Sequence, residues 1–153
     1  MNSIVLLITM IVMWVIVVAS TYQRFYTMPK WFENPPASFE RIRRQSKASQ
    51  AFWLPITALS LIAIVADLIL NWHYLNIRIC ILSALLCFII NGVSTGAYFV
   101  KEILYFARMP ANVSPTGDLL NRTKFWLKWT TVRNVLQIGS AVFISIAYHY
   151  ANH

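Results

Sequence analysis

The sequence has few of the residues that cofactor-binding and catalytic loops require. Only four glycines occur in 153 residues, and no phosphate-binding loop, nucleophile elbow or dinucleotide turn is present. The two cysteines, Cys80 and Cys87, lie in one apolar segment at a spacing too long for a disulfide within a helix. The histidines, cysteines and acidic residues form no complete zinc-binding motif. The sequence therefore predicts no metal and no cofactor.

Charged residues are also scarce, and acidic ones especially so. They make up 12% of the chain against 58% hydrophobic residues, whereas a soluble domain has roughly 25% charged and about 45–50% apolar residues. Thirteen lysines and arginines against five acidic residues give a net charge of +8. No nucleic-acid recognition motif accompanies this charge. The composition predicts a membrane protein whose partner is the lipid bilayer, and no nucleic acid.

Four apolar stretches reach the length of about 20 residues that a transmembrane helix needs. They cover residues 3–21, 51–71, 77–106 and 125–150. Basic residues concentrate in and beside the loops 22–50 and 107–124. Because positively charged loops stay in the cytoplasm, both termini are expected outside it, in a plasma or inner membrane. The predicted fold is a single all-α domain over residues 1–153, an integral membrane four-helix bundle.

The two halves of the chain share a weak pattern. Each half has a Met-Pro pair, at 28–29 and 109–110, and a Phe-Trp pair near the start of its second span, at 52–53 and 125–126. Either the duplication of a helical hairpin or chance similarity would explain this pattern. The basic segment 36–50 has the composition of an amphipathic surface helix, with Ser38 as its N-cap and Phe39 and Ile42 facing the membrane.

Polar residues recur along one face of the third span and along one face of the fourth. Ionisable groups in a span cost several kcal/mol unless they are satisfied, so they are the first candidates for a functional site. Estimated depths place Glu102 within reach of Arg133, and we expect an ion pair between them with Tyr98 beside it. The candidate ligand-binding residues are Asn91, Thr95, Tyr98, Glu102, Trp129, Arg133 and Gln137.

This polar set is compatible with several functions. It favours a site for a small hydrophobic, aromatic or quinone-like molecule, or for a lipid, between the third and fourth spans. Interhelical hydrogen bonds, each worth on the order of 1 kcal/mol, explain Asn91 and Thr95 equally well. A homo-oligomer, or an accessory subunit of a larger membrane complex, is a further alternative. The residue pattern alone does not decide whether the protein is an enzyme.

Several motifs resemble the anthrone-oxygenase-like family, small four-span membrane proteins mostly of unknown function. They are the run Thr95-Gly-Ala-Tyr-Phe-Val-Lys-Glu102, then Arg108-Met-Pro110, and Phe125-Trp-Leu-Lys-Trp129 followed by Arg133-Asn134. Characterised relatives oxidise an anthrone to an anthraquinone with molecular oxygen, without metal or flavin. The resemblance implies a cofactor-independent oxygenase as an alternative function. Tyr98 and Glu102 would then be candidates for proton transfer, and Arg133 for anion stabilisation.

Overall fold

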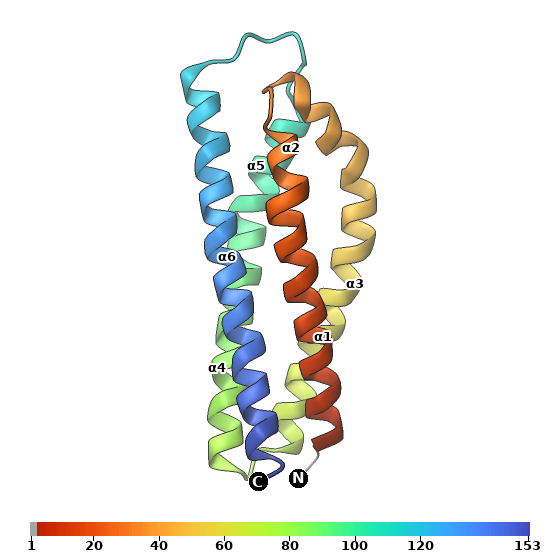
Figure 1. The fold of residues 1–153 in the computed structure, drawn as a ribbon, viewed down its shortest axis with the longest axis vertical. Helices are drawn as coiled ribbons and strands as arrows, with labels where there is room; N and C mark the ends of the chain where they lie inside the picture. Colours follow the sequence, from red (N-terminus) through yellow and green to blue (C-terminus); the bar gives the residue numbers. More distant parts are fainter. Residues whose placement is uncertain (1–2) are drawn as a thin grey trace.

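Long helices that lie side by side make up the protein (Figure 1). The computed structural model describes residues 3–153, with only the backbone described at residues 46 and 47. All regular structure in this range is helical. The start of α1 and the end of α6 lie at the same end of the molecule (Figure 1). The helices are α1 (Ser3–Tyr22), α2 (Met28–Trp31), α3 (Glu40–Leu70), α4 (Leu75–Ser94), α5 (Val100–Arg108) and α6 (Gly117–Tyr150).

Two π-helical turns and one 3₁₀ turn join these helices. The turn η1 (Gln23–Thr27) continues α1 into α2, and η3 (Thr95–Phe99) continues α4 into α5. The 3₁₀ turn η2 (Ala37–Phe39) precedes α3. Consequently α1 with α2, and α4 with α5, each form one long helical rod (Figure 1).

Within the described residues, three helices are long and apolar enough to cross a membrane. They cover Ser3–Trp31, Ala48–Leu70 and Leu75–Arg108. This confirms the membrane character that the composition predicts. The fourth long helix, α6, is more polar, since it turns Thr130, Asn134, Gln137 and Ser140 inward. A fourth crossing, and the side of the membrane on which the termini lie, stay predictions.

The helices extend beyond the apolar stretches seen in the sequence. Helix α3 begins at Glu40 instead of 51, because the basic segment before it is rich in arginine, glutamine and lysine, which are good helix formers. The separate surface helix over 36–50 is therefore wrong. Phe39 and Ile42 are fully buried in the protein rather than turned to the membrane. Ser38 does not cap the helix, since its hydroxyl donates to the Trp31 carbonyl oxygen at 2.7 Å.

The buried side chains form two clusters along the length of the molecule. Near the termini, aliphatic residues such as Leu6, Ile64 and Ile144 pack together. Near the opposite end the cluster is mainly aromatic. It comprises Met28, Trp31, Phe39, Ile42, Phe99, Phe106, Leu119 and Trp126. We call this second group the aromatic core, and it lies next to the candidate site.

Asp67 lies fully buried beside the aliphatic cluster and lacks a hydrogen-bond partner on either carboxylate oxygen within the described residues. Thr9 of α1 is its neighbour, but the Thr9 hydroxyl donates to the Val5 carbonyl oxygen at 3.0 Å. Arg78 forms no ion pair with Asp67, since it stacks on Trp72 at 5.0 Å and donates to the Trp72 carbonyl oxygen. The buried carboxyl group of Asp67 therefore destabilises the folded state.

Replacing Asp67 with leucine is expected to stabilise the protein. The change replaces two unsatisfied buried oxygens with methyl groups in the same branched arrangement, and should raise the free energy of unfolding by about 1–3 kcal/mol. The measurement is thermal unfolding of the detergent-purified protein beside wild type. As a control, Asp118→Leu, at an exposed position in the first turn of α6, should lower the free energy of unfolding by at most about 1 kcal/mol. A loss of stability in Asp67→Leu would contradict the view that this carboxyl group destabilises the fold.

Candidate functional site

The ion pair between Glu102 and Arg133 predicted from the sequence is wrong. Glu102 pairs with Arg122 instead, with Oε1 2.8 Å from Nη2 and Oε2 3.2 Å from Nε. The reason is that α6 begins at Gly117 instead of 125, which brings Arg122 onto the helix at the level of Glu102. Arg133 follows eleven residues later, about 16 Å farther along the axis.

Glu102, Arg122 and Tyr105 form a compact group that joins α5 to α6. The Arg122 guanidinium lies 4.1 Å from the centre of the Tyr105 ring. Its hydrogen bonds to the Glu102 carboxylate raise the pKa of Arg122 above its ordinary value. The Glu102 side chain is 15% exposed, and the Arg122 side chain is 36% exposed. Because both carboxylate oxygens accept from one guanidinium, the pair fixes orientation as well as distance.

Arg133 occupies a second polar group, deeper between α4 and α6. Its Nε donates to the Asn91 side-chain oxygen at 3.1 Å, and its guanidinium carbon lies 4.4 Å from the centre of the Phe99 ring. Asn91 is also tied to Thr95, whose hydroxyl donates to the Asn91 carbonyl oxygen at 2.7 Å. We call Asn91, Thr95, Phe99 and Arg133 the Arg133 site. The structure thus brings together three of the residues predicted from sequence.

The turn η3 explains how Asn91 and Phe99 reach the same guanidinium. In a regular α-helix of 3.6 residues per turn, two residues eight apart point about 80° away from each other. The wider π-helical turn absorbs one extra residue and brings both side chains round to α6. Such turns occur often at functional sites. This turn therefore shapes the Arg133 site.

The remaining predicted residues lie around this site without a hydrogen bond to Arg133. Gln137 is buried one turn farther along α6. Tyr98 packs edge-on against Phe125 at 5.9 Å, and Phe125 packs in the same way against Trp129 at 5.8 Å. Trp129 is 44% exposed. Tyr98, Phe125 and Trp129 thus form an aromatic row beside the Arg133 site.

Arg133 has hydrogen-bonding capacity that the protein does not use. Within the described residues, Nη1 and Nη2 make no hydrogen bond, and only Nε has a partner. Among the described residues, the fully enclosed polar side-chain atoms without a hydrogen-bond partner belong to Asp67 and Trp126. The terminal nitrogens of Arg133 are not in this group, so they are not fully enclosed. An approaching molecule can therefore reach donors that are held in place by Asn91 and Phe99.

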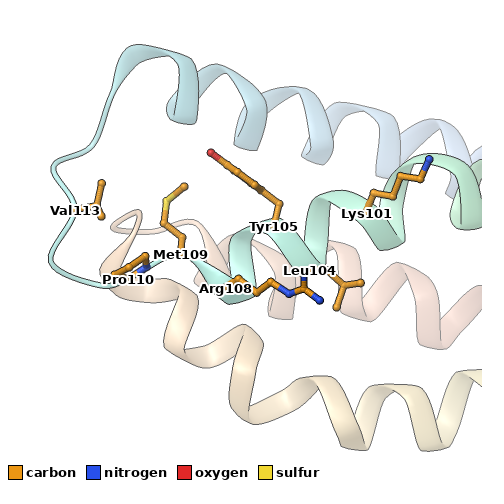
Figure 2. A pocket seen from close by; sticks show the side chains of 7 residues that line it. All are labelled: Lys101, Leu104, Tyr105, Arg108, Met109, Pro110 and Val113. Atoms are coloured by element: carbon orange, nitrogen blue, oxygen red, sulfur yellow. The ribbon is translucent and has the colours of Figure 1, made fainter.

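Sequence reasoning missed a pocket at the end of α5, with a volume of about 560 Å³ (Figure 2). Its lining residues are Lys101, Leu104, Tyr105, Arg108, Met109, Pro110 and Val113. The spacing 101, 104, 105, 108 places four of them along one side of the helix, and this signal was available in the sequence. We call this the α5 pocket. It shares Tyr105 with the Glu102–Arg122 group.

In the part of the chain that the structure describes, no group of three or more histidine, cysteine or acidic side chains is placed to hold a metal ion. No protein-family model, curated protein or solved structure matches this chain. The resemblance to the anthrone-oxygenase-like family therefore stays a prediction, and the functional argument depends on the geometry of the sites above.

Proposed function

We propose that this membrane protein binds a small hydrophobic molecule, quinone-like or lipid, through an oxygen acceptor on that molecule at the Arg133 site. The observation that carries the proposal is the pair of terminal Arg133 nitrogens without a partner in the described residues. A guanidinium within a helical membrane protein is costly unless its donors are satisfied. A carbonyl, phenolate or carboxylate oxygen would satisfy them with charge-assisted hydrogen bonds.

The surroundings of Arg133 suit a ligand with a flat apolar body. Phe99 covers one side of the guanidinium, and the row of Tyr98, Phe125 and Trp129 offers ring faces and edges nearby. Aromatic rings pack favourably against one another in offset or edge-on arrangements. Trp129 is half exposed, so part of this row is open to a molecule that enters from the bilayer. An aromatic or quinone-like ring is therefore the form that the site favours.

Arg133→Gln is expected to abolish retention of this molecule. The measurement is native mass spectrometry of the detergent-purified protein, followed by solvent extraction and identification of the bound compound. Wild type should carry about one molecule per chain, and Arg133→Gln at least about tenfold less, because a lost charge-assisted hydrogen bond costs about 1.5–3 kcal/mol. A short-chain ubiquinone added to emptied wild type should rebind, and should not rebind to the variant.

Arg24→Gln is the matched control for this experiment. Like Arg133, Arg24 donates one hydrogen bond from Nε to a neutral side chain of another helix, in this case Thr131 at 3.1 Å. It should keep the bound compound. Equal retention in all three proteins would contradict the proposal, and so would an unliganded wild type that fails to bind added quinone or lipid. If Arg133→Gln does not fold, Asn91→Leu tests the same site, since it releases the Arg133 Nε and should weaken retention.

A further inference from the structure

The α5 pocket combines an apolar lining with two cationic side chains. Lys101 and Arg108 come from the two ends of the lining segment of α5, with Leu104 and Tyr105 between them. Met109, Pro110 and Val113 follow in the loop that leads to α6 (Figure 2). Leu104 and Val113 are each 42% exposed, so apolar surface is open at the same place as the charges. The pocket therefore offers contacts to a molecule that is partly apolar and partly anionic.

The positive charge of this pocket is not neutralised by neighbouring carboxylates. Within the described residues, Lys101 and Arg108 form no ion pair. Glu102, which is adjacent to Lys101 in the sequence, is already held by Arg122. The other two glutamates pair elsewhere, Glu33 with Arg41 and Glu40 with Arg43 and Arg44. An anion is the partner that this charge distribution favours.

One wall of the pocket is held in position before any ligand arrives. The Arg122 guanidinium lies over the Tyr105 ring at 4.1 Å, and Arg122 is itself fixed by two hydrogen bonds to Glu102. The Tyr105 ring also packs against Phe106 at 5.8 Å. Phe106 belongs to the fully buried aromatic core. A side chain that is ordered in advance lowers the entropic cost of binding.

The position of the pocket limits the kind of anion. It lies at the end of the apolar segment Leu75–Arg108, where a membrane-crossing helix meets the headgroup layer. Basic pockets at this level bind the head groups of anionic lipids. The sequence also predicts that this end faces the cytoplasm, the side on which anionic lipids concentrate. A water-soluble anion would gain nothing from the exposed Leu104 and Val113.

We propose that the α5 pocket is a binding site for an anionic phospholipid. Lys101 and Arg108 are about 10 Å apart along the helix axis, so their long side chains can converge on one phosphate between them. The glycerol and the upper acyl chain lie against Leu104, Met109 and Val113, and Tyr105 forms the fixed wall. This site is separate from the Arg133 site and does not depend on what binds there.

The test is a lipid titration followed by native mass spectrometry of the detergent-purified protein. Phosphatidylglycerol and phosphatidylcholine with identical acyl chains are the two probes. The double variant Lys101→Gln/Arg108→Gln is compared with Lys124→Gln/Lys128→Gln, which removes the same charge from exposed positions of α6 that do not line the pocket. The pocket variant should bind phosphatidylglycerol about tenfold more weakly than wild type, and the control no more than about twofold more weakly.

Each other outcome overturns the proposal in a distinct way. Equal losses in both double variants would mean that diffuse surface charge attracts the lipid, and an unchanged pocket variant would mean that the lipid binds elsewhere. Equal binding of the two lipids by wild type would exclude recognition of the anion. Displacement of the lipid by millimolar inorganic phosphate would reduce the site to a phosphate site. If the pocket variant does not fold, Leu104→Glu places a repelling charge in the same pocket and should cause a comparable loss.

Discussion

Replacing Phe106 with alanine is expected to lower the free energy of unfolding by about 3–5 kcal/mol. Phe106 is fully buried, and its ring lies 5.3 Å from that of Phe32 and 5.2 Å from that of Phe39. These rings come from three separate parts of the chain, since Phe106 belongs to α5, Phe32 follows α2 directly, and Phe39 belongs to η2. The truncation removes apolar contacts and leaves a cavity that several elements would have to close together.

The measurement for Phe106→Ala is unfolding of the purified protein in mixed micelles of rising denaturing-detergent content. Phe125→Ala is the matched control, because it deletes the same atoms from a ring that is 50% exposed. We expect the control to cost about 1 kcal/mol, the usual size of a change away from the core. If the two variants lost equal stability, the aromatic core would not be the tightly packed part of this fold.

Reversing the charge at position 102 is expected to have the second-largest effect. Glu102→Arg places two cations together where a bidentate pair now joins α5 to α6. Breaking a buried pair costs about 3–5 kcal/mol, and since Arg122 is 36% exposed we expect a loss of about 2–3 kcal/mol here. The swapped double variant Glu102→Arg/Arg122→Glu should recover about half of this loss or more.

The same unfolding assay, run as a double-mutant cycle, measures this coupling. Glu33→Arg serves as the control, because Glu33 and Arg41 form an exposed pair with side chains 60% and 49% accessible. Its loss should stay within about 1 kcal/mol, as for exposed ion pairs in general. If the swapped variant recovers nothing, the contribution of Glu102 comes from something other than Arg122. The arrangement of the Glu102–Arg122 group would then need another explanation.

The membrane character and the location of the deeper polar site follow from local sequence properties. A helix must be apolar over the thickness of the bilayer to cross it, so hydropathy predicts four spans, and three of them coincide with the apolar helices of the structure. Asn91, Thr95 and Arg133 lie together because helical spacing fixes which residues share a face. These features depend on periodicity within one helix or two neighbouring ones, and the sequence displays that periodicity directly.

The ion-pair partner of Glu102 could not be predicted from the lengths of the apolar stretches alone. Helix α6 begins before its apolar stretch, and the Thr116 hydroxyl accepts a hydrogen bond from the Leu119 backbone N–H at its start. Threonine at such a position, followed by Gly117 and Asp118, is a helix-start signal that the sequence contains. The π-helical turn η3 has no comparable signal in the sequence. The α5 pocket likewise depends on the course of the loop after Met109.

The π-helical turn Thr95–Phe99 also determines how this protein would respond to changes in chain length. Because the turn already absorbs one extra residue, deleting one residue there would convert the wide turn to a regular one and leave the facing of later residues nearly unchanged. Glu102 would then still face Arg122, whereas the same deletion in a regular part of the rod before the turn would rotate Glu102 and the side chains of the α5 pocket by about 100°. The turn is thus a place where the rod can lose one residue and keep the surface that α5 presents.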